Sequence, residues 1–214
     1  AADHGARVVN MSFEGTPMSI MTDAARYLQE QRGGVVVKSA GNSGTFTSTA
    51  DNPYILKISG TDLYDDICSF SVTGNDIDLA APADSIGTTN NRGTYSFGTG
   101  TSAAAPIVSG VAALMLSVNP DLTGVEIQDI LKQSADDLGP PGWDPGYGWG
   151  RVNAARAVQM ARDAGPPVGD TTPPSITVVD PTPGSLSGGM ITILADASDN
   201  AAVAQVDLYV DNSF

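Results

Sequence analysis

Residues 100–116 read Gly-Thr-Ser-Ala-Ala-Ala-Pro-Ile-Val-Ser-Gly-Val-Ala-Ala-Leu-Met-Leu, within a longer stretch, residues 94–120, that carries no charge. A membrane span needs about 20 apolar residues. The apolar part here, residues 103–118, is shorter and is interrupted by Pro106 and Gly110. We therefore predict a buried central helix. Pro106 is expected to be tolerated because the first turn of a helix has N–H groups without intrahelical partners.

The segments on either side of this helix predict a parallel sheet covered by helices. Four short apolar runs lie at residues 7–13, 35–37, 54–59 and 77–81. Between the first two, apolar residues recur at helical spacing over residues 19–32 and stop at Gly33-Gly34, a helix C-cap. A capping box at residues 123–126 opens a further helix, and a last one covers residues 153–163. Strand, helix and strand joined by tight glycine turns indicate βαβ units.

Ser102 stands where the predicted central helix begins. This is the positive end of the helix macrodipole, and the N–H of Ser102 itself would be one of the first-turn donors without an intrahelical acceptor. A hydroxyl in that position can form an alkoxide or a tetrahedral oxyanion that the helix end stabilises. The alternative, on the local pattern alone, is that Ser102 only caps the helix.

A second candidate is Asn42, in Ala40-Gly41-Asn42-Ser43-Gly44, just past the second predicted strand. Loops at the carboxyl ends of parallel strands commonly carry the functional sites of α/β folds. The asparagine amide is a neutral donor of two protons and suits a substrate carbonyl oxygen on which charge develops. An ordinary turn is the alternative, because Asn-Ser-Gly is common turn chemistry.

Taken together and in order, three motifs closely resemble the subtilisin-like serine proteases, or subtilases: N-M-S-F at 10–13, V-V-V-K-S-A-G-N-S-G at 35–44, and the segment at 100–116. Residues 146–154, G-Y-G-W-G-R-V-N-A, are similar to the closing Y-G-x-G-x-x-N-A segment of that family. The resemblance covers about residues 4–164. It implies an α/β fold, a parallel-sheet αβα subtilisin-like sandwich, with residues 1–164 as the C-terminal half of the catalytic domain.

The resemblance also implies a role for each matching residue. Ser102 matches the nucleophile that forms the acyl-enzyme, with its N–H as one oxyanion donor. Asn42 matches the second donor, and Thr101 would support this oxyanion hole. Two segments would flank the substrate and wall the S1 pocket, which takes the side chain before the scissile bond: Ser12, Phe13 and Glu14, and Ser39, Ala40 and Gly41. The pocket floor is expected within residues 45–52.

Three positions depart from the family pattern. Glu14 stands where glycine is usual, which would narrow the P2–P4 subsites, make them acidic and favour basic substrate residues. Ala103 replaces the common methionine after the nucleophile and so removes an oxidation liability. Ile107 replaces the usual histidine, and little consequence for the chemistry is expected.

The catalytic base of the family has no match in this chain. A subtilase triad runs Asp, His, Ser along the sequence, and the only histidine here is His4. The family base opens a helix, whereas His4 lies just before the predicted strand at 7–13. We therefore interpret Asp3-His4-Gly5 as a helix C-cap. The catalytic Asp and His are expected in an N-terminal half-domain, preceded by a signal peptide, outside these 214 residues. The chain alone should then have little or no turnover.

Composition changes near residue 165. The chain has 10 Lys and Arg against 24 Asp and Glu, a net charge of −14, which excludes a phosphate-neutralising nucleic-acid binder and disfavours docking on anionic lipid. All basic residues precede position 165. The remainder begins with a proline-rich linker, residues 165–174, and shows β-type runs at 175–179, 190–197 and 203–210. Residues 175–214 resemble the start of a bacterial Ig-like domain, an incomplete all-β sandwich.

No cofactor is expected. The single cysteine, Cys68, cannot form an internal disulfide, no Cys/His cluster suits zinc, and Cys68 is predicted to be a small buried residue. Calcium is possible, because several side chains of residues 175–214 carry oxygen ligands. These are Asp196, Asp199, Asn200, Asp207 and Asp211. The alternative is that these residues are solvent-exposed side chains in turns and edge strands and bind no calcium.

Two function classes remain. The first is a secreted serine endopeptidase that cleaves polypeptides through an acyl-enzyme on Ser102. The second is a non-catalytic subtilase-like scaffold or adhesin with an Ig-like module. A hydrolase of the G-x-S-x-G type is excluded, because Ser102 lies in G-T-S-A-A with no glycine two residues later. The presence of both Ser102 and Asn42 favours the endopeptidase.

Overall fold

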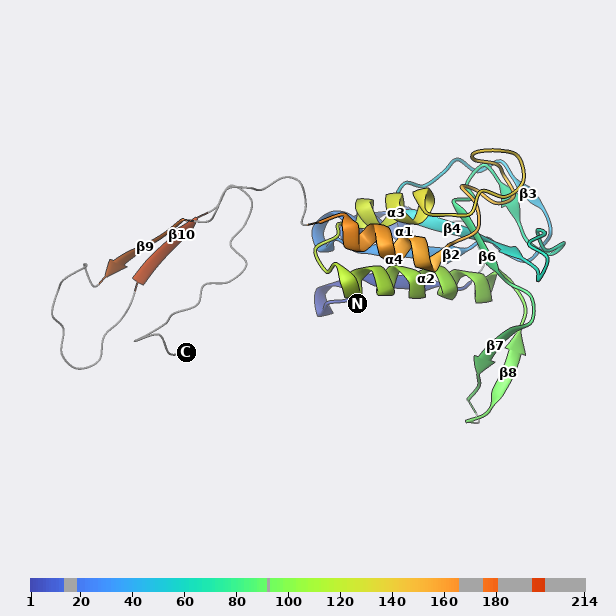
Figure 1. The fold of residues 1–214 in the computed structure, drawn as a ribbon, viewed down its shortest axis with the longest axis horizontal. Helices are drawn as coiled ribbons and strands as arrows, with labels where there is room; N and C mark the ends of the chain where they lie inside the picture. Colours follow the sequence, from blue (N-terminus) through green and yellow to red (C-terminus); the bar gives the residue numbers. More distant parts are fainter. Residues whose placement is uncertain (14–18, 92, 166–174, 181–193, 199–214) are drawn as a thin grey trace. The chain divides into compact units, whose positions relative to one another are not determined.

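The computed structural model describes residues 1–13, 19–91, 93–165, 175–180 and 194–198 (Figure 1). The chain divides into two compact units, Ala1–Pro166 and Pro167–Phe214. The candidate site lies in the first unit, so most of the description concerns that part.

Four parallel strands form the central sheet of the first unit, in the order β1-β2-β4-β6. They are β1 (Val8–Met11), β2 (Val35–Ser39), β4 (Ile55–Thr61) and β6 (Leu79–Pro82). Each lies at one of the four predicted apolar runs, with its ends moved by a few residues. The runs are almost continuously apolar because a parallel sheet is covered on both faces.

Helices cover both faces of this sheet, as the α/β prediction requires. Helix α1 (Ser19–Arg32) packs Ala25 and Leu28 against Val36 and Ile55 on one face. On the other face, α2 (Thr101–Val118), α3 (Gly124–Gln133) and α4 (Ala154–Asp163) share one core with the sheet. The members of that core include Val37, Ile58, Leu79, Val108, Met115, Leu131 and Ala157. The αβα architecture is confirmed.

Helix α2 is the predicted central helix. Its length and hydropathy would suffice to cross a membrane. In the structure it contacts all four strands of the sheet, and Figure 1 shows it running along one side of the domain beside α4. Its buried residues, such as Ala104, Ala105 and Val108, face the core. The apolar composition of this segment is therefore explained by packing between sheet and helices.

Pro106 is not tolerated for the predicted reason, a place in the first helical turn. Pro106 lies in the second turn of α2, where a proline leaves the carbonyl four residues earlier without its usual N–H donor. That carbonyl belongs to Ser102. The hydroxyl of Ser12, just after β1, donates to it over 2.9 Å. A side chain from another element thus replaces the missing helix bond and holds the end of β1 against the start of α2.

Helices α3 and α4 begin as predicted. Thr123 and Glu126 form both hydrogen bonds of the capping box at the start of α3. Asn153 caps α4 by accepting the N–H of Arg156 over 3.0 Å.

Among the described residues, four short strands were not predicted: β3 (Phe46–Thr47), β5 (Thr73–Gly74), β7 (Ile86–Thr89) and β8 (Tyr95–Gly98). The last two form an antiparallel hairpin that projects from the rest of the first unit (Figure 1). Tyr95 and Phe97 are 85% and 81% exposed. The hairpin therefore lacks the alternation of buried and exposed residues by which a strand is found in a sequence.

In the second unit, β9 (Ser175–Asp180) pairs antiparallel with β10 (Leu194–Ser198). These strands lie at two of the three predicted β-type runs. The third, residues 203–210, lies outside the described residues.

A buried carboxylate couples the stability of the sheet to pH. Asp78 is 4% exposed; its Oδ1 lies 2.7 Å from Lys132 Nζ, and its Oδ2 accepts the N–H of Lys57 over 2.7 Å. Burial raises the pKa of Asp78 to about 6, although the nearby Lys132 ammonium lowers it. An unfolded aspartate has a pKa of about 3.9, so the folded state binds this proton more tightly.

The stabilisation from protonating Asp78 is therefore complete below about pH 4 and is lost as the pH rises through about 6. We expect Asp78→Asn to remove this contribution. Between pH 7.5 and 4.5 the unaltered chain should gain about 2 kcal/mol of unfolding free energy relative to the variant. Urea unfolding of both at the two pH values measures the difference. A difference that does not change with pH would contradict the prediction.

Candidate active site

Ser102 lies in the first turn of α2, at the edge of the sheet where the strands end. Gly100, the N-cap, donates its N–H to Ala83 O just after β6 (2.8 Å), while Ser12 binds the Ser102 carbonyl from the end of β1. The Ser102 side chain is exposed. The helix start is thus fixed from two sides, and the hydroxyl remains open to a reactant.

Asn42 reaches the same point from the loop after β2. Its Oδ1 accepts the Thr101 N–H over 2.8 Å and the Thr101 hydroxyl over 3.1 Å. The hydroxyl in turn accepts the N–H of Gly41 over 3.0 Å. Because both Thr101 groups donate to the oxygen of the amide, the donor NH₂ end is directed away from Thr101. Thr101, which is fully buried, therefore sets the orientation of the amide.

Gly100 shows how closely Ser102 and Asn42 converge. A side-chain carbon placed on Gly100 would lie 3.2 Å from Asn42 Nδ2 and 3.2 Å from Ser102 Oγ. The backbone of Gly100 has φ 140° and ψ 160°, a conformation that residues with a side chain rarely adopt. Glycine is thus required here both by backbone conformation and by the space that the two polar groups share.

This arrangement can stabilise a negatively charged oxygen next to a nucleophile. The N–H of Ser102 belongs to the first helical turn, where backbone donors lack intrahelical acceptors, and the helix dipole favours negative charge there. The Asn42 amide supplies a side-chain donor on the other side of Gly100. Two donors around a developing oxyanion are what acyl transfer needs.

The structure places two predicted wall segments side by side. Ser39 is buried at the end of β2, and its hydroxyl lies 3.4 Å from Met11 O and 3.5 Å from Phe13 O. Gly41 follows with φ 114°. Ser12 and Phe13 form the facing segment, while Glu14 lies outside the described residues, so the prediction about its subsites stays a prediction.

A cleft that the sequence did not predict lies between α2 and the β7–β8 hairpin and includes Ser102. The cleft has a volume of about 400 Å³. It is lined by Ile86, Gly87, Thr88, Gly98, Thr99, Ser102, Ala103, Pro106 and Ile107. Ala103 and Ile107, two of the departures from the family pattern, are thus wall residues of a cleft that includes Ser102.

The first unit matches a known protein family. The model of the Subtilase family matches residues 1–150. The chain belongs to this family. A second model, the Bacterial Ig domain, matches residues 174–214. The two matches follow one another in the order that the sequence predicts.

Relatives of this subtilase are proteases. The halolysin-like extracellular serine protease Nep of Natrialba magadii is 36% identical over 77% of this chain and 30% of its own length. Thermitase of Thermoactinomyces vulgaris is 35% identical over 74% of this chain and 56% of its own length. A protease structure from Pseudoalteromonas arctica has a TM-score of 0.63, 31% identity, and coverage of 73% of this chain and 51% of that one. The chain thus spans about a third to a half of these relatives.

The one histidine of this subtilase lies away from Ser102. His4 belongs to the 3-10 helix η1 (Ala2–His4), which Gly5 ends with φ 84°. η1 precedes β1, whereas Ser102 meets the residue after β1, so His4 and Ser102 lie at opposite ends of that strand. Asp3 accepts hydrogen bonds from Tyr27 and Arg32, which lower its pKa in that order. The interpretation of Asp3-His4-Gly5 as a helix C-cap is confirmed.

In the part of this subtilase that the structure describes, no group of three His, Cys, Asp or Glu residues is arranged to hold a metal ion. Of the calcium candidates, Asp196 lies on β10. The other four, Asp199, Asn200, Asp207 and Asp211, lie outside the described residues, so the calcium expectation stays untested. Cys68 is buried, as predicted, and burial raises the pKa of its thiol.

Proposed function

We propose that this chain carries the nucleophile and the oxyanion hole of a serine endopeptidase that hydrolyses polypeptides through an acyl-enzyme on Ser102. The observation that carries the proposal is the convergence of Ser102 Oγ and Asn42 Nδ2 beside Gly100, each 3.2 Å from the same point. Membership of a family whose relatives are serine proteases supports the same chemistry.

In the proposed reaction, Ser102 Oγ attacks the carbonyl carbon of the scissile bond, and the carbonyl oxygen becomes an oxyanion. The Ser102 N–H and the Asn42 amide stabilise that oxyanion. Collapse of the intermediate expels the amine and leaves an ester on Ser102, which water then hydrolyses. Ser12, Phe13, Glu14 and Ser39, Ala40, Gly41 flank the substrate, and residues 45–52 provide the floor of the S1 pocket.

The proton of Ser102 must pass to a base, and later from that base to the leaving amine. His4 lies at the far end of β1 and cannot serve. We propose that a histidine and an aspartate from outside these 214 residues supply this function. We call this chain together with that pair the complete enzyme. Because one relative is named an extracellular protease, we also propose an extracellular location.

The 214-residue chain alone is expected to show no casein hydrolysis and no labelling by a fluorophosphonate probe within hours, because Ser102 lacks a base. Loss of a triad member costs about 10⁴–10⁶ in kcat. The complete enzyme, as the matched comparison, should be labelled on Ser102 within minutes, and peptide mass spectrometry identifies the residue.

Full activity of the 214-residue chain alone would contradict the proposal that the catalytic histidine and aspartate come from outside it. A complete enzyme that is neither labelled nor active would instead favour the alternative, a non-catalytic scaffold or adhesin with an Ig-like module.

A further inference from the structure

The cleft that includes Ser102 lies on the side of the site away from the proposed S1 walls. Those walls follow β1 and β2, toward one edge of the sheet, whereas the hairpin that borders the cleft follows β6, at the other edge (Figure 1). The lining of the cleft contains Ser102 but no residue of the walls. Ser102 therefore stands between two surfaces. A substrate whose residue before the scissile bond enters the walls brings the residue after that bond to the cleft.

The lining of this cleft is uncharged. Ile86, Pro106 and Ile107 supply apolar side chains from β7 and α2. Ala103, which stands where the family pattern has methionine, leaves space directly beside the nucleophile. The volume of about 400 Å³ falls within the range of ligand pockets, about 300–1,000 Å³. An apolar side chain would gain by leaving water here, whereas a charged one would lose hydration without a counter-charge in the lining.

Gly98 keeps the cleft open. It lies in β8 opposite Ile86, and its φ is not positive. A side-chain carbon placed on it would meet only Ile86 O and Thr88 Cγ2, each at 4.0 Å. Neither backbone conformation nor lack of space requires glycine here, in contrast to Gly100. Because glycine weakens a strand and often marks a place where a ligand comes close, we interpret Gly98 as space left for a ligand.

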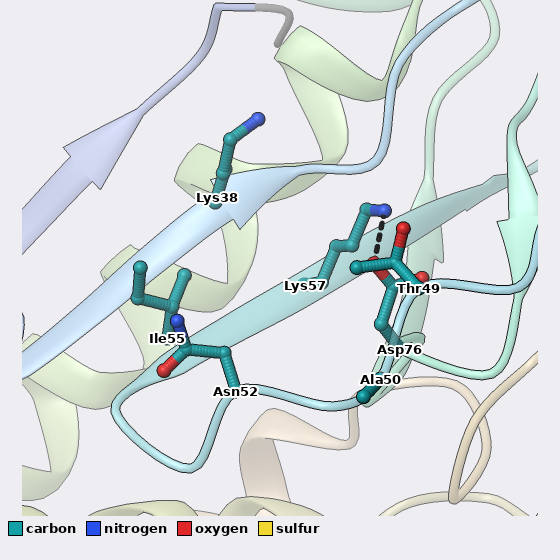
Figure 2. A pocket seen from close by; sticks show the side chains of 7 residues that line it. All are labelled: Lys38, Thr49, Ala50, Asn52, Ile55, Lys57 and Asp76. Carbon is teal, nitrogen blue, oxygen red and sulfur yellow. Dashed lines mark hydrogen bonds and ion pairs between the residues drawn. The ribbon is translucent and has the colours of Figure 1, made fainter. Parts of the chain in front are cut away.

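A smaller cavity near the sheet has a different character. Figure 2 shows this cavity, of about 80 Å³, and the ion pair in its lining between Lys57 Nζ and Asp76 Oδ2 at 2.6 Å. Its lining contains neither Ser102 nor any residue of the two wall segments. This charged cavity therefore does not compete with the cleft for the residue after the scissile bond.

We propose that the cleft is the S1′ subsite, which takes the side chain of P1′, the residue directly after the scissile bond. Gly98 makes this subsite selective for a large apolar side chain such as leucine. The inference rests on the proposed function. Thr88 and Pro106 are exposed, so the cleft is open to solvent and buries only part of the side chain. The preference for leucine over alanine should therefore be about 10-fold, at the lower end of what hydrophobic pockets distinguish.

Asp84 suggests the competitor that a test must include. The hydroxyl of Thr99, a lining residue, donates to Asp84 Oδ1 over 2.9 Å. A carboxylate thus lies one hydrogen bond behind the cleft, where an arginine at P1′ could pair with it. A comparison of leucine with arginine at P1′ separates recognition of apolar surface from recognition of charge.

The experiment measures kcat/KM of the complete enzyme on four peptides that differ only at P1′: Leu, Ala, Asp and Arg. We expect the Leu peptide to be cleaved fastest, about 10-fold faster than the Ala peptide. Gly98→Leu places a side chain beside Thr88 in the cleft and should bring the Leu/Ala ratio within about two-fold of one.

Phe97→Leu is the matched control. Phe97 precedes Gly98 in β8, is 81% exposed and does not line the cleft. The variant alters the same strand on its other side, so the Leu/Ala ratio should stay near that of the unaltered enzyme.

A second measurement needs no variant to fold. The ester on Ser102 can react with the amine of an amino-acid amide in place of water. The amine nitrogen bonds to the acyl carbon, the ester bond to Ser102 Oγ breaks, and a proton of the amine passes through the base to Oγ. Leucine amide should compete with water about 10-fold better than alanine amide, because it occupies the same subsite.

The outcomes are distinguishable. Cleavage of the Ala, Asp or Arg peptide at least as fast as the Leu peptide would overturn the inference and leave the proposed function intact. A preference for leucine that is unchanged in Gly98→Leu, or lost equally in Phe97→Leu, would also overturn it. A complete enzyme that cleaves none of the peptides and no casein would overturn the proposed function, and this inference with it.

Discussion

Replacing Ser102 with alanine is expected to abolish peptide hydrolysis by the complete enzyme, with kcat falling about 10⁶-fold. That size comes from the nucleophile of a subtilisin, a member of the same family. The reason is chemical: the other hydroxyl beside the Asn42 amide, that of Thr101, is fully buried and donates to Asn42 Oδ1, so it is not open to a substrate carbonyl. Initial rates on a chromogenic peptide measure the loss.

The fold should survive this change. Ser102 is exposed, and the hydrogen bond from Ser12 goes to its backbone carbonyl, which alanine retains. The melting temperature should therefore shift by little. Ser43→Ala is the matched control, since Ser43 is an exposed serine beside Asn42 whose hydroxyl contacts Thr45 at 2.8 Å. Equal activity losses in the two variants would contradict the assignment of Ser102.

Replacing Asn42 with alanine is expected to lower kcat by about 10²–10³ with little change in KM. This magnitude was likewise established in a subtilisin. The amide is expected to act in the transition state, when negative charge develops on the substrate oxygen, so substrate binding in the ground state changes little. Separate measurement of kcat and KM tests this.

Asn42→Asp gives a sharper test. The aspartate has the same shape and can still accept both hydrogen bonds from Thr101, but it replaces the donor NH₂ with a charged oxygen. We expect a loss of kcat at least as large as for alanine. An Asp variant with normal kcat would show that Asn42 is only a turn residue, which is the alternative that the local sequence allowed.

Much of the fold follows from local sequence. The apolar runs that became β2, β4 and β6 mark buried strands, because burial on both faces requires nearly continuous apolar residues. The run at β1 marks an edge strand that is only partly buried, and the helical periodicity of α1 marks the one face that packs on the sheet. The β7–β8 hairpin escaped prediction for the opposite reason, since it is largely exposed and no pattern of burial is imposed on its residues.

Within the site, the resemblance pointed to Ser102, Asn42 and Thr101, and the structure places all three around Gly100. Lys38 was quoted within a motif but assigned no role. The signal was one charged residue at the end of a run of valines, which in a strand predicted to be buried calls for a specific partner. The lining of the cleft beside Ser102 left no comparable signal, because Ile86, Thr88 and Thr99 are ordinary loop and strand residues.

The sequence by itself determined the strands of the central sheet and the helices α1 to α4, where the nucleophile candidate stands and which family the motifs resemble. These features depend on residues close together in the chain, through periodicity, capping and glycine turns. Only the tertiary structure decided how Thr101 orients Asn42 and how Ser12 replaces the helix bond lost at Pro106. It also decided that the buried Lys38 donates hydrogen bonds to Phe13 O and Ser39 O, one in each of the two proposed wall segments. Each of these is a contact between residues brought together by the packing of parallel strands against α2, and no local pattern specifies such a contact.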